Sequence, residues 1–375
     1  MPGFKLPPKA ERGGPVRKWA DPMAASKDRG KWLASAKPAP ALEGLDWASM
    51  DALCSSESGS GGVLFARLQS GTVVLKGCST VAQEYVAAEL GRELHMPVPR
   101  ATLVSYPSAE WHALQDAATK ILKPEDAPVP DGALLLKASK MLNRPHLLVF
   151  EYVQARMLLA AAADADGVRS TREALWDDEG TLLRRLGQLM ALDVMLNNWD
   201  RVPLIWQHAG NLNNLMVRVA ADGDAGRAIH GIDQVAAGIT DTEKAAEYVA
   251  KVRALCVGVR AATATHGGSV GAQGVPGSAH AQRACAALSQ VQGVGFDEEA
   301  AARLIDAGLD EGLRKVGTLG EAEGGAHAYF ERVWQRCDAL CAPDADWGDV
   351  WKSSLALVSP VLLGDVVDAV RETYS

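Results

Sequence analysis

The sequence predicts an α+β protein with two lobes, a small strand-rich lobe followed by a larger helical one. Two observations support this prediction. Short apolar runs separated by Gly- and Ser-rich turns gather before residue 153, and long segments with helical periodicity follow it. Strands and helices therefore do not alternate along the chain, which argues against a doubly wound parallel sheet.

Composition limits the class of protein. The 375 residues are 48% hydrophobic and 22% charged, as in a soluble globular protein that buries a sizeable core. A formal net charge of −8 argues against non-specific binding to nucleic acid. The six Cys are scattered without metal-ligand spacing, which fits a reducing compartment, so we expect a cytoplasmic protein. We find no run of about 18 apolar residues that would predict a membrane span, and the N-terminus lacks a signal core.

The strand-rich lobe is predicted at residues 44–153. Residues 1–43, rich in Pro, Gly, Lys and Ala, are expected to form a tail that is flexible or wrapped on the surface. The predicted strands are VLFARL (63–68) and TVVLK (72–76), which form a hairpin, then ATLVSY (101–106) and LLVFEYV (147–153). Residues 107–146 show no clear pattern, and we assign no element to them.

The helical lobe is predicted at residues 154–375. One helix precedes it in the strand-rich lobe, in STVAQEYVAAELGREL (79–94), where Thr80 and Gln83 have the spacing of a capping box. The further helices are predicted at 155–165, 181–197, 243–257, 279–292, 297–316, 323–341 and 360–373. Two short apolar runs, 214–217 and 228–233, interrupt this series.

The first candidate site in the chain is a glycine-rich stretch that could bind phosphate. Gly59, Ser60, Gly61 and Gly62 lie just before a predicted strand, where glycines let backbone N–H groups approach a phosphate closely. A flexible hairpin tip explains the same residues without any function. The pattern fits neither a Walker motif nor a dinucleotide-binding motif.

A lysine and an acidic residue follow that stretch. Lys76 ends a strand at a position where alternation would bury its cation, although a surface lysine that extends to solvent is the simpler interpretation. Glu84 lies beside the apolar face of the next helix and could pair with Lys76. Glu89, on the opposite side of that face, is the rival partner.

The stretch NNWDRVPLIWQHAGNLNNLMV (197–217) places an acid and several amides between apolar segments. Asp200 could orient or deprotonate an attacking hydroxyl. Asn213 precedes one short apolar run and Asp233 ends the next, so both could supply hard oxygen ligands to Mg²⁺. Each residue alone is more simply a turn or cap residue.

The strand at 147–153 could link the two lobes. Glu151 and Val153 would then offer backbone groups to a planar base, although a core strand needs no such function. These groups follow one another along the chain in the order found in enzymes that transfer a phosphoryl group from a nucleotide. The order is a Gly loop, a strand Lys, a helix Glu, a linker strand, and then Asp, Asn and Asp.

With these motifs in place, the chain resembles the protein-kinase-like superfamily, and within it the actin-fragmin kinase catalytic domain. The matching stretches are VLKG (74–77), AQEYVAAELGRELHMPVPR (82–100), LNNWDRVPLIW (196–206), GNLNNLMV (210–217) and GIDQ (231–234). His-Arg-Asp of ordinary protein kinases is absent, Asp200 and Asn213 are farther apart than in them, and Asp233 precedes Gln234 instead of Phe-Gly. Phosphoinositide-type atypical kinases, which share the Asp-Arg order, are the nearest competitors.

The resemblance implies a role for each motif. ATP would lie under Gly59–Gly62, with Lys76 on its phosphates and Glu84 holding Lys76. Asp200 would be the catalytic base, and Asn213 and Asp233 the Mg²⁺ ligands.

The remaining polar residues have less defined roles. Arg201 would orient Asp200 or compensate charge, and four amides are expected only to hold the loop's shape: Asn197, Asn198, Asn211 and Asn214.

The implied reaction transfers phosphate to a serine or threonine of a protein, and actin is the substrate that the family suggests. Two other hypotheses stay open. One is a catalytically inactive kinase-like module that binds actin or another protein. The other is an atypical kinase acting on a lipid or a small molecule.

Overall fold

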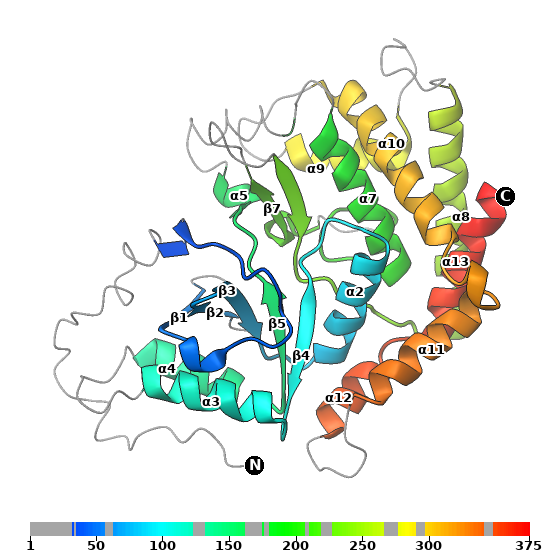
Figure 1. The fold of residues 1–375 in the computed structure, drawn as a ribbon. Coiled ribbons are helices and arrows are strands. Elements are labelled where there is room, and N and C mark those ends of the chain that lie inside the picture. Colours follow the sequence, from blue (N-terminus) through cyan, green and yellow to red (C-terminus); the bar gives the residue numbers. More distant parts are fainter. Residues whose placement is uncertain are drawn as a thin grey trace. The chain divides into compact units, whose positions relative to one another are not determined.

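The computed structural model describes residues 32–33, 35–56, 63–122, 132–161, 175, 180–206, 210–218, 227–265, 277–289, 297–340 and 348–375. Contacts divide the chain into two compact units. The sheet unit comprises Met1–Tyr85, Pro99–Gln154 and Cys341–Ser354, and the helical unit comprises Val86–Val98, Ala155–Leu340 and Leu355–Ser375. The predicted α+β class, strand-rich first and mostly helical afterwards, is confirmed (Figure 1). Each unit is built from several separate segments, whereas the predicted lobe boundaries are contiguous.

The sheet unit contains a five-stranded antiparallel sheet in the order β1-β2-β3-β5-β4. Its strands are β1 (Ala52–Ser55), β2 (Val63–Leu68), β3 (Gly71–Lys76), β4 (Ala101–Ser105) and β5 (His146–Glu151). The predicted hairpin is confirmed, with Phe65 opposite Val74 in the β2–β3 register. The order places β3, which ends in Lys76, at the centre of the sheet.

Helices of the sheet unit cover residues that the sequence pattern left unassigned. Residues 107–146, which were left unassigned, contain α3 (Ala109–Leu122) and α4 (Gly132–Leu142). The sheet unit also contains the 3-10 helix η2 (Trp47–Ser49), the start of the predicted helix α2 (Val81–Glu93), and α12 (Gly348–Leu355). Figure 1 shows α3 and α4 beside the sheet. The buried side chains of α3, among them Trp111 and Leu114, join one core cluster with Leu64, Val73 and Leu75 of the sheet.

The predicted tail is shorter than expected. Thr72 donates its backbone N–H to the carbonyl of Lys37 at 2.7 Å, and Ala39 donates to the carbonyl of Thr72 at 3.2 Å. Ala39 and Leu42 are buried in the core of the sheet unit. Residues 36–42 therefore belong to the sheet unit and its core, and not to the predicted tail that is flexible or wrapped on the surface; residues 1–31 lie outside the described residues.

Among the described helices of the helical unit, α7 is the most buried in the core, with both of its faces largely covered. The helices of this unit are α5 (Leu158–Ala161), α7 (Thr181–Leu196), α8 (Thr242–Thr265), α9 (Ala279–Ser289), α10 (Glu298–Gly317), α11 (Ala326–Asp338) and α13 (Pro360–Tyr374), with short 3-10 helices η3 (Leu212–Asn214) and η4 (Glu321–Glu323). A small sheet has the order β6-β7-β8, with β6 (Arg156–Met157), β7 (Leu215–Arg218) and β8 (Ala228–Gly231). The predicted helix at 155–165 is wrong at its start, because β6 occupies those positions.

Helices α7 and α10 pack backbone against backbone (Figure 1). A Cβ atom added at Gly308 would lie 1.8 Å from the carbonyl oxygen of Arg184, and one added at Gly187 would lie 2.2 Å from that of Ile305. No side chain fits at either position without moving a helix. The central packing of the helical unit thus depends on two glycines.

We expect Gly308→Ala to destabilise the protein by about 3 kcal/mol, because the added methyl group meets backbone that cannot move aside. Gly258→Ala on α8 is the matched control, since a Cβ there meets nothing within 4 Å. The control should be stabilised by about 0.5–1 kcal/mol through helix propensity. Urea unfolding of both variants measures the difference. Equal effects of the two substitutions would contradict the close packing.

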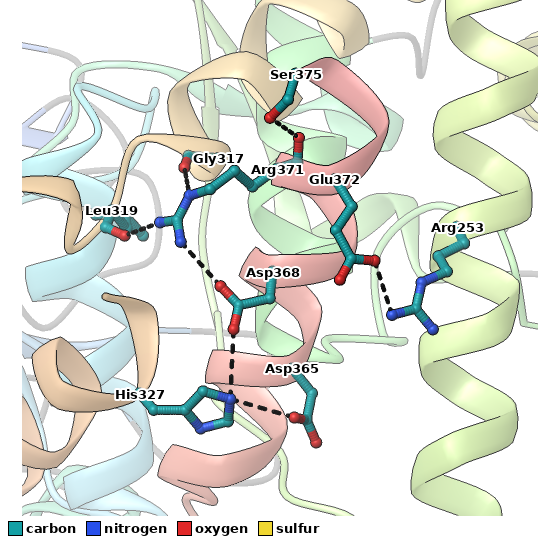
Figure 2. A network of polar contacts seen from close by, with 9 residues as sticks. All are labelled: Arg253, Gly317, Leu319, His327, Asp365, Asp368, Arg371, Glu372 and Ser375. Atoms are coloured by element: carbon teal, nitrogen blue, oxygen red, sulfur yellow. Dashed lines mark hydrogen bonds and ion pairs between the residues drawn. The ribbon is translucent and has the colours of Figure 1, made fainter. Parts of the chain in front are cut away.

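Polar contacts fix α13 to its neighbours (Figure 2). Arg371 donates to the carbonyl oxygens of Gly317 at 2.9 Å and Leu319 at 2.7 Å, and also to Asp368 at 2.9 Å. His327 of α11 lies 3.5 Å from the carboxylate of the same Asp368. Arg371 thereby satisfies carbonyl groups at the end of α10 that no helical N–H reaches.

The C-terminal stretch Asp349–Tyr374 is apolar enough by composition to cross a membrane, with a mean hydropathy of 1.6 in its most apolar window. Among the described residues it is the one such stretch. It forms two helices, α12 and α13, and 56% of that window is buried inside the protein. Burial on this scale is typical of core helices.

Candidate functional site

The first part of the site is an ion pair in the sheet unit. Lys76 Nζ at the end of β3 lies 2.7 Å from Oε2 of Glu84 in the first turn of α2, and the two side chains are only 12% and 4% exposed. Glu89, the rival partner, instead pairs with Arg92 at 2.9 Å. The predicted Lys76–Glu84 pairing is confirmed. The Lys76 cation is thereby held by an almost fully buried carboxylate.

The second oxygen of the Glu84 carboxylate is also held. Thr80 Oγ1 donates to Glu84 Oε1 at 2.9 Å, and the Cys78 thiol lies 3.2 Å from the same atom. Burial, and then the charge of Glu84, raises the pKa of Cys78 to about 12, so the thiol stays protonated and can donate. Two short local contacts therefore leave Oε2 directed at Lys76.

The start of α2 is capped in a way that the sequence does not predict. The hydroxyl of Thr80 is directed to Glu84, so the predicted capping box with Gln83 is wrong. The backbone N–H groups of Ala82 and Gln83 donate instead to Ser354 Oγ of α12, at 3.1 and 3.3 Å. Ser354 is almost fully buried. A residue about 270 positions away thus satisfies the first turn of the helix that carries Glu84.

The predicted phosphate loop, Gly59–Gly62, lies outside the described residues. Its two ends are described: Ser55 pairs with Leu64, and Ser56 donates its N–H to the carbonyl of Val63 at 2.8 Å. The segment therefore connects the antiparallel strands β1 and β2. Its predicted role stays a prediction.

The predicted base-binding residues lie at the end of β5. The backbone N–H of Glu151 donates to the carbonyl of Arg100 at 2.9 Å, and its carboxylate accepts from Arg100 Nε at 3.1 Å. That N–H is not available to a ligand. The backbone groups that could still bind a planar base, as predicted, are the carbonyl of Glu151 and the backbone groups of Val153.

The second part of the site lies in the helical unit, just after α7. Asn197 ends that helix in the left-handed region, with φ of 53°, and the chain then turns toward Asp200. Asn214 Nδ2 donates to the Asp200 carbonyl at 2.7 Å and to its carboxylate at 3.1 Å. Asn211 Nδ2 reaches the same carboxylate oxygen at 3.4 Å. Two amides therefore orient the carboxylate of Asp200.

Asn213 and Asp233 lie at the same end of the β7–β8 ribbon. Leu215 pairs with Gly231, and Ile232 donates its N–H to the carbonyl of Asn214 at 3.0 Å. Asn213 in η3 precedes Asn214, and Asp233 follows Ile232, so each is next to this contact in the chain. Both residues are exposed. Through Asn214, the structure brings Asp200 to the same edge.

The chemistry of these groups fits a magnesium ion. Carboxylate and amide oxygens are the hard ligands that Mg²⁺ prefers, and it commonly uses one or two of them together with substrate phosphates. In the described part of the chain, no group of three or more His, Cys, Asp or Glu could hold a metal by itself. Asn213 and Asp233 would each supply one such oxygen.

Arg201, predicted to orient Asp200 or compensate charge, lies in the interior of the helical unit. Its side chain is fully buried and pairs with the buried carboxylate of Asp193. It also donates to the backbone carbonyls of Asn214 at 3.3 Å and Ile232 at 2.9 Å. A guanidinium enclosed in this way cannot touch a substrate; of the two roles predicted for Arg201, orienting Asp200 or compensating charge, its pair with Asp193 fits the second. Arg201 joins α7 to both ends of the candidate metal site.

The other amides hold the loop, as predicted. Asn198 donates to Asp193 at 2.7 Å, and Asn197 donates to the Ala237 carbonyl at 3.2 Å. Asn211 donates its backbone N–H to the carbonyl of Arg201 at 3.0 Å, which closes the base of the segment between them.

Sequence reasoning did not single out Asp193 or Ser354. Asp193 had a signal, because an acid in the apolar helix LGQLMALDVML is buried and needs a partner. Ser354 had none, since its partners are distant in the chain. A cavity of about 710 Å³ in the helical unit was also not predicted; His95, Arg184 and His230 are among its lining residues. None of the predicted site residues lines it.

Two comparisons with known proteins bear on this site. The family model described as actin-fragmin kinase, catalytic, matches residues 31–235, which include every predicted site residue. A Dictyostelium discoideum protein named "Putative actin-fragmin kinase" is 24% identical over 179 residues, which is 44% of this chain and 39% of the relative. The match therefore spans well under half of that relative's length.

Proposed function

Since the chain belongs to the actin-fragmin kinase catalytic family, we propose that it is an ATP- and Mg²⁺-dependent kinase that phosphorylates a serine or threonine of a protein. The family is one of kinase-like phosphotransferases. The proposal of ATP, Mg²⁺ and a protein hydroxyl as the reactants rests on the residues of the site. The observation that carries it is that Asn214 holds the carboxylate of Asp200 and also accepts the N–H of Ile232, so the residues on either side of this contact, Asn213 and Asp233, follow the same end of the β7–β8 ribbon. A carboxylate held by amides beside two hard oxygen ligands suits phosphoryl transfer to a hydroxyl.

Each residue then has one task. Asp200 accepts the proton of the acceptor hydroxyl or orients that hydroxyl. Asn213 and Asp233 would hold Mg²⁺, and Lys76, fixed by Glu84, would contact the nucleotide phosphates. Bound Mg²⁺ supplies neutralisation of the charge that develops on the phosphates.

The proposed acceptor comes from the name of a relative. The name of the Dictyostelium discoideum relative mentions actin, and that relative is covered only in part. We propose actin as the first protein to test. The kinase assignment does not depend on it.

The test is transfer of label from γ-labelled ATP to monomeric actin by purified protein, with and without Mg²⁺. Transfer that needs Mg²⁺ and is absent in Asp200→Asn supports the proposal and the substrate together. Transfer to other proteins, but not to actin, would retain the kinase and reject the substrate.

Two outcomes overturn the proposal. Nucleotide binding with no transfer to any protein in a broad panel would establish an inactive kinase-like module. Transfer to phosphoinositide vesicles or a soluble metabolite, but to no protein, would establish a lipid or small-molecule kinase.

A further inference from the structure

Helix α12 makes specific contacts with the start of α2, and all of them lie within the sheet unit. Ser354 Oγ accepts hydrogen bonds from the N–H groups of Ala82 and Gln83. These are groups of the first helical turn, which have no partner inside the helix itself. The end of α12 therefore provides the N-terminal cap of α2.

A buried tryptophan anchors α12 beside that cap. Trp351 has no exposed surface, and its ring lies 6.0 Å from that of Tyr85 on α2 and 5.4 Å from that of His146 on β5. The hydroxyl of Ser354 is one turn further along α12. Because the anchor contacts both β5 and α2, the position of the cap is fixed relative to the sheet and the helix.

The capped turn is the one that carries Glu84. Glu84 follows the two capped N–H groups directly, and its carboxylate holds Lys76 at 2.7 Å. A shift of this turn changes the direction of the carboxylate, and with it the position of the Lys76 cation. The contacts of Thr80 and Cys78 fix the carboxylate within the turn, while Ser354 fixes the turn itself.

We propose that α12 is a built-in positioning element for the Lys76–Glu84 pair, and that Ser354 acts as its positioning residue through the cap on α2. The element lies outside residues 31–235 that match the family model. Its effect on catalysis rests on the function proposed above. In this protein the helix that bears Glu84 is held in place by a segment of the same chain, residues 348–355.

The experiment compares three variants at a temperature well below their unfolding transitions. Ser354→Ala removes the acceptor, Ser354→Thr keeps a hydroxyl, and Ser353→Ala is the matched control because its side chain is exposed on the same helix. For each protein we would measure hydrogen exchange at Ala82 and Gln83, and the rate at which an amine-acylating reagent modifies Lys76.

Ser354→Ala should accelerate exchange of the two amides and acylation of Lys76 by roughly tenfold each. Its kcat should fall by a similar factor, with the KM for the protein acceptor unchanged. Ser354→Thr should restore most of the wild-type behaviour, and Ser353→Ala should match wild type throughout.

The outcomes separate this proposal from the proposed function. Faster amide exchange with unchanged Lys76 acylation and unchanged kcat would show that Ser354 only stabilises the helix, and would overturn the positioning role. Wild-type protein that transfers no phosphate would remove the kinase assignment. The exchange and acylation measurements would then still decide whether α12 positions the ion pair.

Discussion

Asp200→Asn should lower the rate of phosphoryl transfer by two orders of magnitude or more while leaving nucleotide affinity nearly unchanged. An amide at this position cannot accept the proton of the attacking hydroxyl. It can still accept hydrogen bonds through Oδ1, so the contacts from Asn214 and Asn211 can persist and the loop should keep its shape. A lower rate in this variant would therefore reflect the loss of the catalytic base and not a change in folding.

The measurement is single-turnover label transfer together with a nucleotide-binding isotherm for each protein. Asp241→Asn is the matched control, because Asp241 is an exposed residue whose carboxylate accepts from the N–H groups of Glu243 and Lys244 at the start of α8. Asparagine caps helices as well as aspartate does, so the control should behave as wild type. If Asp200→Asn retained more than a tenth of the wild-type rate, Asp200 would not be the base.

Arg201→Met should destabilise the protein by about 3–5 kcal/mol, the range expected when one partner of a buried ion pair is removed. The substitution leaves the Asp193 carboxylate enclosed without its cation, and it also frees the carbonyls of Asn214 and Ile232. The loss should be visible as a large shift of the urea unfolding midpoint at pH 7.5.

The pH dependence of that loss has a definite sign. Burial raises the pKa of Asp193 to about 6, and the nearby Arg201 opposes that rise. Without the arginine, the pKa in the folded protein should rise further above its value in the unfolded chain. A raised pKa gives stability at low pH that is lost as the pH increases through the folded-state value. The deficit of Arg201→Met should therefore be smaller at pH 5 than at pH 7.5.

Two further variants test this explanation. Arg185→Met changes an exposed arginine on α7, the helix that carries Asp193, and should alter stability by no more than about 0.5 kcal/mol. Combining Arg201→Met with Asp193→Leu removes the stranded charge and should recover part of the lost stability. A double variant no more stable than Arg201→Met alone would show that the backbone contacts of Arg201, and not the ion pair, carry the effect.

Local patterns predicted the parts of the fold that depend on neighbouring residues. The alternation in VLFARL and TVVLK was sufficient for the β2–β3 hairpin, and helical periodicity was sufficient for α7 and α10. The same alternation turned Lys76 inward, and the apolar face of α2 placed Glu84 within its reach. These inferences needed only the geometry of one strand and one helix.

The rest depends on contacts between distant segments. Helix α3 is an exception, because its buried residues Trp111, Leu114, Ala118 and Leu122 recur at helical spacing and could have been recognised within residues 107–146 alone. The burial of Arg201 follows from three separate stretches meeting around it, and no spacing reveals that. The capping box failed for the same reason, since the acceptor for Ala82 and Gln83 comes from Ser354. The Gly59–Gly62 prediction lies on residues that the structure does not describe.

The enclosed Asp193–Arg201 pair also constrains how this sequence can vary. A change at either position alone leaves a charge without solvent or partner, whereas a matched change at both can keep the interior neutral. We therefore expect covariation: among relatives, positions 193 and 201 should be exchanged together, as two apolar residues or as another complementary pair. Asp200, one residue away, should show no such coupling to position 193, because its carboxylate is oriented by amides that follow it in the chain.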